Sequence, residues 1–300
     1  MEEKEYSFPP LFINSFVLKV VALGLMTIDH IMAALSILGP FSSTNSAIII
    51  IRGICRLAYP LFCFMIVQGA IHTKRFSNYA LRLGIMASVI SLGLILGYYL
   101  PFLKLEQLRN QGIIFLDLLL GAVAIYCLKN KRWSIKLLAI LPVAYSVAST
   151  FARGLDCAVC GQDIWFVPFF MRTQYDFLGV LMMILMYVGY EFSNYIFSKY
   201  NGAYENTKAH QFSRNLSMVL ALIAANLVFY VFQLNATEIF NLYVDTIPDI
   251  QLLSTLAVIF ILFYNGKPGY NKIWFRHGSY LYYVVHLIII FGIFVLIYGY

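Results

Sequence analysis

The sequence is 300 residues long, 61% hydrophobic and only 12% charged, whereas a typical soluble domain is about 45–50% apolar and about 25% charged. A water-soluble fold could not bury so much apolar surface, so the composition excludes a soluble globular domain and indicates an integral membrane protein. The net charge of +7 comes from basic residues scattered over many loops. This scatter argues against a nucleic-acid partner, because such proteins gather their basic residues in one patch.

Hydrophobic stretches long enough to cross a hydrocarbon core recur along the whole chain. They are expected near residues 17–38, 46–70, 76–100, 112–128, 134–151, 173–191, 214–234, 249–264 and 279–299. The fourth and eighth are short, so about nine spans are expected, and eight or ten are also compatible with the sequence. No linker, low-complexity segment or internal repeat divides the chain. We therefore expect residues 1–300 to form a single all-α, polytopic transmembrane helix bundle.

The distribution of Lys and Arg predicts the orientation, because these residues collect in cytoplasmic loops. Of the 21 basic residues, four fall in loops expected outside and two within a predicted span, which leaves fifteen in segments expected inside. The outer four are Lys104, Arg109, Arg153 and Arg172. This bias predicts a cytoplasmic N-terminus and an external C-terminus. The stretch from Met1 to Lys19 lacks the basic region and cleavage site of a secretory signal, so the first span is expected to stay in the mature protein.

Two cysteines, Cys157 and Cys160, form a C-x-x-C in a loop that is expected outside. Facing an oxidising compartment, they could close a small disulfide or remain as thiols. A metal would need two further ligands, and the neighbouring sequence offers none. No metal site is expected.

Five ionisable residues are expected well inside predicted spans, away from the span ends, where a charged side chain costs at least about 2.5–3.5 kcal/mol. Asp29 and His30 lie in the first span, Arg52 and Arg56 in the second, and His286 in the last. Counting about 1.5 Å per residue from the nearest loop places all but Arg52 roughly 15 Å deep, near the midplane. An ionisable residue at this depth is a candidate functional residue.

Helical spacing limits how these groups can combine. Arg52 and Arg56 are four residues apart on one helix face, so both can point at the same ligand or cavity. Asp29 and His30 are neighbours about 100° apart, so Asp29 is expected to pair with an arginine of the second span, Arg56 in particular, leaving His30 free for a cavity. The alternative is purely structural, with Asp29 and Arg56 forming an ion pair and His30 and His286 hydrogen-bonded between helices.

The loop after the second span is basic, with His72, Lys74 and Arg75 followed by Arg82. Because it is predicted to be cytoplasmic, it could bind an anionic cytosolic ligand such as the phosphates of coenzyme A. Ordinary positive-inside charge is the alternative, particularly for Lys74 and Arg75. The sequence has no Walker loop, G-x-S-x-G elbow or H-E-x-x-H motif.

Several blocks of sequence occur in an order that resembles a known family. The blocks are Leu18–His30 ending in Ile-Asp-His, Arg52–Gly69 with the pattern R-x-x-x-R-x-x-x-P-x-F, His72–Arg82, Tyr264–Gly269 and Tyr282–His286. Together they resemble the TraX family, whose named member is the plasmid conjugation protein that N-acetylates F-pilin. The last block is also similar to the closing helix of the broader transmembrane acyltransferases.

The resemblance implies an acetyltransferase of the bacterial cell membrane that moves an acetyl group from acetyl-CoA to an acceptor at the membrane. The acceptor would be a pilin-like N-terminal amine or a surface glycan hydroxyl. His30 is the expected general base, because imidazole titrates near neutral pH. The expected catalytic group is His30, Asp29, Arg52 and Arg56, and the expected donor-binding residues are His72, Lys74, Arg75, Arg82 and His286. Gln68 departs from the family pattern, which has Glu at that place.

Two other functions use the same features. A proton-coupled transporter could employ the midplane Asp, Arg and His residues, although the missing repeat argues against it. A non-catalytic assembly protein of a conjugation-like system is the other alternative. Binding of acetyl-CoA would separate an enzyme from a scaffold, and acetyl transfer would separate an enzyme from a transporter.

Cysteine labelling tests the predicted orientation. Single cysteines placed near Arg75, Arg132, Lys208 and Lys272 should escape a membrane-impermeant reagent added outside intact cells, because the basic bias places these loops inside. A cysteine placed near Gln162 should react. The reverse pattern would overturn the orientation.

Overall fold

A computed structural model describes residues 10–37, 39, 41, 45–100, 109, 111–158, 166–200, 208–240 and 251–298. Within these ranges the regular elements are helices, and the extended pairing consists of two isolated β-bridges. The helices are α1 (Ser15–Ile37), α2 (Ser46–Cys55), α3 (Ala58–His72), α4 (Phe76–Tyr99), α5 (Ile114–Lys129), α6 (Trp133–Leu137), α7 (Ile140–Ala158), the short 3₁₀ helix η2 (Phe169–Met171), α8 (Asp176–Tyr200), α9 (Lys208–Phe240), the 3₁₀ helix η4 (Leu253–Ala257), α11 (Val258–Leu262) and α12 (Ile273–Tyr298). The expected all-α bundle is confirmed. Cys157 and Cys160, for which a disulfide or free thiols were expected, lie outside the residues whose side chains the structure describes.

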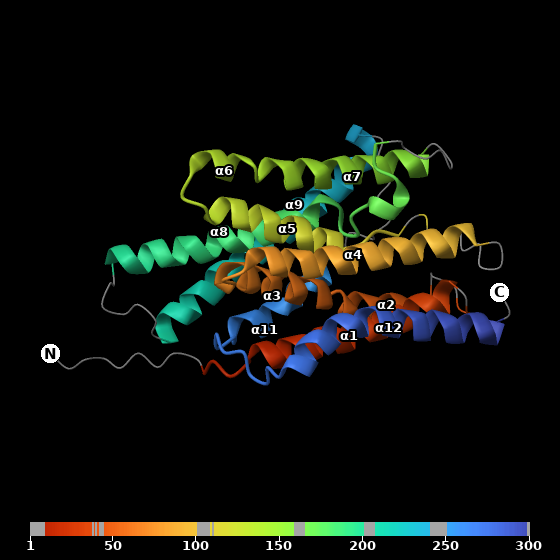
Figure 1. The fold of residues 1–300 in the computed structure, drawn as a ribbon, viewed down its shortest axis with the longest axis horizontal. Helices are drawn as coiled ribbons and strands as arrows, with labels where there is room; N and C mark the ends of the chain where they lie inside the picture. Colours follow the sequence, from red (N-terminus) through yellow and green to blue (C-terminus); the bar gives the residue numbers. More distant parts are fainter. Residues whose placement is uncertain are drawn as a thin grey trace.

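Most of the long helices lie roughly along one axis, α9 crosses them obliquely, and α1 and α12 are neighbours that run in the same direction (Figure 1). We call the end where α1, α4 and α12 begin and α3 ends the inner end, and the opposite end the outer end. One core of buried side chains joins α1, α3, α4, α5, α8, α9 and α12. Many large apolar side chains remain exposed on the flanks, as expected of helices that face lipid.

Seven helical segments are long and apolar enough to cross a membrane. They are residues 15–36, 46–72, 76–99, 133–156, 176–199, 208–236 and 273–298, and each coincides with an expected span. The fourth and eighth expected spans correspond to shorter helices, α5 with 16 residues and the segment Leu253–Leu262. These are the two spans that already looked short in the sequence. The polytopic architecture is therefore confirmed.

The second span is interrupted between α2 and α3. Pro60 lacks a backbone N–H, and its ring excludes regular helix geometry around the carbonyl of Arg56, four residues earlier. Arg56 and Leu57 each donate a hydrogen bond of 3.2 Å to the carbonyl three residues before them, a tighter 3₁₀-type pattern. Arg56 N–H also donates at 3.1 Å to the carbonyl of Arg52. The two arginines therefore remain one helical turn apart on the same side of the helix, as expected, and the irregularity follows them.

At the inner end, the start of the chain is joined to the segment before α12. Ile13 forms a parallel β-bridge with Tyr264, and the hydroxyl oxygens of Ser15 and Tyr264 lie 2.8 Å apart. Gly266 and Gly269 have φ angles of 74° and 64°, in the left-handed region that glycine adopts without strain. This turn, which contains an Asn-Gly and a Pro-Gly pair, holds the beginnings of α1 and α12 side by side.

At the outer end, two arginines converge on Asp156 of α7. Arg109 Nη2 lies 2.9 Å from one carboxylate oxygen, and Arg172 Nη1 lies 2.6 Å from the other. The Arg172 side chain is only 1% exposed, so its charge depends on this partner for compensation. The cluster joins α7 to the segments before α5 and α8.

Asp117 of α5 fixes the segment that precedes α8. Its Oδ2 accepts hydrogen bonds from the backbone N–H groups of Gln174 at 2.7 Å and Tyr175 at 3.3 Å. Gly112 packs so closely on Thr173 that a Cβ would lie 2.3 Å from its carbonyl oxygen, so this contact requires glycine. The position of Tyr175 is therefore set by α5.

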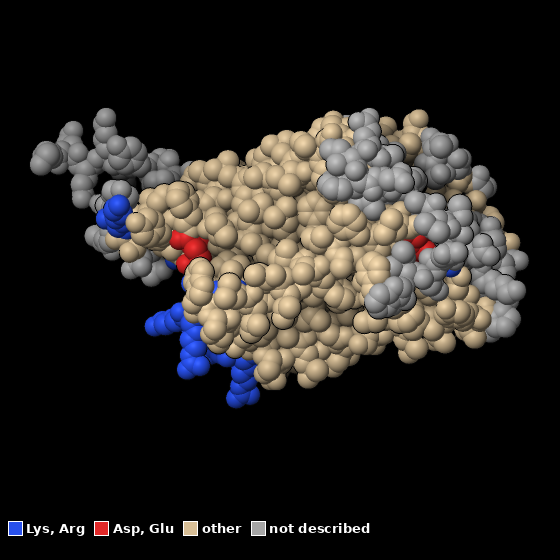
Figure 2. Space-filling view, turned by 90° about the horizontal axis from the view of Figure 1, so that it is seen from above, with Lys and Arg blue, Asp and Glu red and all other residues tan. Residues whose placement is uncertain are grey.

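Basic side chains gather at the inner end of the face seen in Figure 2, and a broad flank without charge separates them from the outer end. An uncharged flank of this kind is what a hydrocarbon core requires. The gathering at one end agrees with the positive-inside bias of the sequence. The orientation itself stays a prediction.

Removal of the Asp156 charge should destabilise the outer end. Asp156→Asn leaves Arg172 buried without its anion, so the free energy of unfolding should fall by about 3–5 kcal/mol. The readout is the thermal unfolding midpoint of the purified protein, with Lys131→Gln, at an exposed position, as the control. Equal midpoints for the two variants would show that the cluster contributes little to stability.

Candidate functional site

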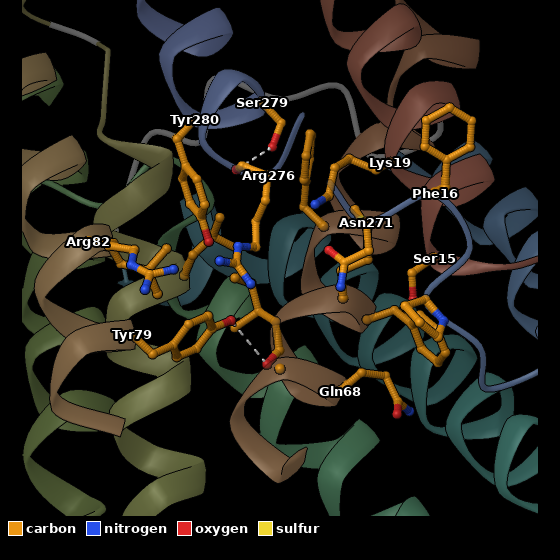
Figure 3. Close-up of a pocket in the computed structure, with 18 of the residues that line it drawn as sticks. Ser15, Phe16, Lys19, Gln68, Tyr79, Arg82, Asn271, Arg276, Ser279 and Tyr280 are labelled. Carbon is orange, nitrogen blue, oxygen red and sulfur yellow. Dashed lines mark hydrogen bonds between the residues drawn. The ribbon is translucent and has the colours of Figure 1, made fainter. Parts of the chain in front are cut away.

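A cavity of about 560 Å³ lies at the inner end, walled by α1, α3, α4, α5, α12 and the segment from Tyr264 to Asn271 (Figure 3). Its volume is within the range of about 300–1,000 Å³ that is typical of small-molecule sites. In the cavity wall, Gly69 of α3 packs against the side chain of Tyr79 of α4. A Cβ at position 69 would lie 2.7 Å from the Tyr79 hydroxyl. The walls combine aromatic rings with a few polar groups, as ligand sites commonly do.

Three cationic side chains from three helices line this cavity: Lys19 of α1, Arg82 of α4 and Arg276 of α12. Figure 3 shows them around one shared space, beside the ring of Tyr280. Among the described residues that line the cavity there is no Asp or Glu. A partly enclosed cleft with charge of one sign attracts a ligand of the opposite sign. The cavity is therefore suited to an anion.

Tyr283 connects the cavity to the middle of the bundle. Its ring lines the cavity together with Phe115, and the two ring centroids are 4.7 Å apart at an interplanar angle of 84°. The same ring lies 6.2 Å from the His30 ring and 5.6 Å from the His286 ring, measured between centroids. The deep wall of the cavity is thus in contact with both histidines.

The two midplane histidines are hydrogen-bonded to each other. His30 Nδ1 lies 2.7 Å from His286 Nε2, and His286 Nδ1 lies 2.7 Å from the backbone carbonyl oxygen of Tyr282. The Tyr282 hydroxyl in turn lies 2.7 Å from the Thr27 hydroxyl of α1. α1 and α12 are therefore joined by two polar contacts within the membrane-spanning region.

These contacts determine the tautomers of the neutral histidine pair. A carbonyl oxygen only accepts, so His286 must donate through Nδ1 and keep the lone pair on Nε2. His30 then donates through Nδ1 to that lone pair, which leaves its own Nε2 without a proton. An unprotonated ring nitrogen is what a general base or a nucleophile requires.

Asp29 pairs with an arginine of the second span, as expected. Arg52 Nε lies 3.2 Å from Asp29 Oδ1, and the side chains are 32% and 21% exposed. The expected coupling of Asp29 to Arg56 stays a prediction. An ion pair is the arrangement expected of two charged groups at this depth, because lipid does not solvate charge.

Arg56 is directed toward Tyr175. Its Nη1 donates to the Tyr175 hydroxyl at 3.4 Å, and its guanidinium carbon lies 5.9 Å from the centre of that ring. Tyr175 also stacks on Tyr59 with ring centroids 3.5 Å apart. Because Asp117 holds the backbone of Tyr175, the outer network reaches the arginine at the helix break.

The structure divides the expected site residues into two groups. His30, Asp29, Arg52 and Arg56 lie in the middle of the bundle, and His286 joins them rather than lining the cavity. Of the other expected donor-binding residues, His72 and Arg82 line the cavity. Lys74 and Arg75 are exposed beyond its lining.

Sequence reasoning missed Lys19, Arg276 and Tyr283 as parts of the site. Helical periodicity contained a signal for them: Lys19 precedes His30 by eleven residues and Arg276 precedes Tyr283 by seven, so each pair shares one helix face. No three His, Cys, Asp or Glu side chains meet as a metal site within the described ranges.

A family model described as TraX protein matches residues 15–294. The chain belongs to the TraX family. Comparison with curated proteins and with solved structures gave no match. Membership in the TraX family indicates a conjugation-related membrane protein, and the matched range includes the histidine pair and the walls of the cavity.

The Asp29–Arg52 pair should behave as a coupled unit in this TraX-family chain. Asp29→Ala and Arg52→Ala should each lower the yield of monodisperse protein, because each leaves an uncompensated charge inside the bundle. The double variant should lose less than the sum of the two single losses. Thermal midpoints and yields of the four proteins measure the coupling, and strictly additive losses would contradict it.

Proposed function

We propose that this chain is an acetyltransferase that transfers an acetyl group from acetyl-CoA to a hydroxyl or amine at the membrane. The proposal rests on the position of the Tyr283 ring between the cavity and the histidine pair. On one side of this ring lies a cavity lined by cations, and on the other lies a histidine pair whose hydrogen bonds leave Nε2 of His30 unprotonated.

Acetyl-CoA has the shape and charge that this arrangement suits. Its nucleotide carries phosphates, and a long thin arm places the thioester far from them. Along α12, seven residues separate Arg276 near the mouth from Tyr283 at the deep wall, which corresponds to about 10 Å. A donor with its phosphates at the mouth would therefore direct its thioester toward the histidines.

The proposed reaction uses His30 as the base. The acceptor hydroxyl or amine transfers its proton to Nε2 of His30 while its oxygen or nitrogen attacks the thioester carbonyl. The carbon–sulfur bond then breaks, and the proton passes to the thiolate, so that coenzyme A leaves as a thiol. A relay through acetyl-histidine would use the same nitrogen as the nucleophile.

The neighbouring charges have supporting roles in this proposal. Arg52 and Arg56 can stabilise the negative charge that develops on the carbonyl oxygen. Asp29 orients Arg52 through their salt bridge. His286 orients His30 by accepting its Nδ1 proton, so its role is in positioning the base rather than in binding the donor.

The acceptor is proposed to be presented at the membrane, as a pilin-like N-terminal amine or a surface glycan hydroxyl. The resemblance to an acetylating family member and the conjugation-related character of the family support this class. Incubation of membranes with acetyl-CoA labelled on the acetyl group tests it, because the label should appear on protein or glycan. Label that stays in acetyl-CoA would favour a transporter or an assembly protein.

Substitution of His30 should abolish most of the transfer. His30→Ala removes the base, so acetyl transfer per monodisperse molecule should fall by roughly 10²- to 10⁴-fold, while Ala preserves the helix. His277→Ala, at an exposed position of α12, is the matched control and should keep full activity.

His286 distinguishes positioning from structure in the same assay. His286→Gln should retain more activity than His286→Ala, since an amide oxygen can accept the Nδ1 proton of His30. A purely structural histidine pair predicts lower yields with normal activity per folded molecule. A fully active His30→Ala protein would rule out the proposed base.

A further inference from the structure

We propose that Lys19, Arg82 and Arg276 form a nucleotide-binding site in which they recognise phosphate and the aromatic rings beside them hold the base. The proposal deepens the proposed function and rests on it for the identity of the nucleotide as that of coenzyme A. The three residues come from α1, α4 and α12, so only the assembled bundle brings them together.

The three cations have no counter-ion in the described part of the chain. The ion pairs in the described ranges are formed by other cations, among them Arg52, Arg109, Arg153 and Arg172. Lys19 is partly buried, and its ammonium lies 5.5 Å from the centre of the Phe275 ring and close enough to Arg276 for the two charges to repel. Like charges gathered in a partly buried cleft are unfavourable without a ligand, and an anion relieves the repulsion.

The donor groups around the cations suit phosphate. Guanidinium groups bind phosphate oxygens in a bidentate manner, and an ammonium adds a compact positive charge. Asn271 and Ser279 also line the cavity and are among the side chains drawn around the cations in Figure 3. Hydroxyl and amide groups can donate further hydrogen bonds to phosphate oxygens.

An aromatic cluster beside the cations favours a nucleotide over a phosphate without a base. Phe16, Tyr270 and Phe275 all line the cavity. The Phe16 ring centroid lies 5.5 Å from that of Tyr270 and 4.9 Å from that of Phe275, and Tyr270 is 41% exposed. Nucleic-acid bases stack favourably on aromatic rings of this kind. A lipid headgroup offers phosphate but has no base to stack.

The test measures binding of coenzyme A to the full-length protein in nanodiscs of zwitterionic lipid, by calorimetry. Lys19→Gln, Arg82→Gln and Arg276→Gln should each raise the dissociation constant by roughly 10- to 100-fold, the usual loss for one charge-assisted hydrogen bond. Lys19→Arg should retain most of the affinity.

The matched controls are Lys74→Gln and Arg75→Gln, because these exposed cations lie at the same end of the molecule outside the cavity lining. They should leave the dissociation constant unchanged. The thermal midpoint of Lys19→Gln without ligand should equal or exceed that of the unmodified protein, since a repulsive contact is removed. Tyr270→Ala should weaken coenzyme A more than inorganic phosphate, because phosphate has no base to stack.

The outcomes separate this proposal from the proposed function. Unchanged affinity in all three Gln variants would overturn the nucleotide site, even if acetyl transfer persists. Binding of coenzyme A that depends on the three cations, without any acetyl transfer, would support the site and contradict the acetyltransferase. If the unmodified protein ignores coenzyme A but retains phosphatidylglycerol through these cations, as read by native mass spectrometry, the ligand is a lipid headgroup and the proposal fails.

Discussion

A hydrogen bond of 2.7 Å between His30 and His286 joins the first and last long helices of the bundle, and the functional geometry depends on it. Lys19 lies eleven residues before His30, and Arg276 lies ten residues before His286. Because α1 and α12 run in the same direction (Figure 1), a contact between the histidines brings the two cations to nearly the same level, about 15 Å away. Together with the Thr27–Tyr282 contact, this polar contact therefore sets the register of the two helices that wall the cavity at the inner end.

The polar groups of this bundle fall into two classes that differ in how their charge is compensated. At the outer end, Asp156 is paired with Arg109 and Arg172. These pairs satisfy buried charge and hold the segments that join the helices, which is a structural task. At the inner end the cavity gathers cations without acidic partners among its described lining. The cations of the cavity are therefore available to bind an anionic ligand. The ion pairs of Asp156, in contrast, stabilise the fold.

Between these ends, each arginine of the second span makes a polar contact in the middle of the bundle. Arg52 meets Asp29 of α1, and Arg56 meets Tyr175, whose backbone is held by Asp117. The middle of the bundle is thus tied to the outer network through Tyr175. A change at the outer end can therefore reach Arg56, since the position of its partner is set there.

The sequence by itself determined the features that depend on local chemistry. Apolar stretches located the spans, because hydropathy is a property of a short window. The rise per residue placed His30 and His286 at one level. Each of these inferences needs only a few consecutive residues. Membership in the TraX family was likewise readable from blocks of sequence taken in order.

The tertiary structure decided which helices are neighbours, and hydropathy does not encode that. It placed Arg52 beside Asp29 and Arg56 beside Tyr175, because α1 and the segment before α8 meet the second span only in the assembled bundle. It selected Lys19 and Arg276 for the cavity and left out Lys74 and Arg75, since a side chain lines a cavity only where several helices converge. It also set the tautomers of the histidine pair, because these follow from one backbone carbonyl that only the folded geometry brings within hydrogen-bonding distance.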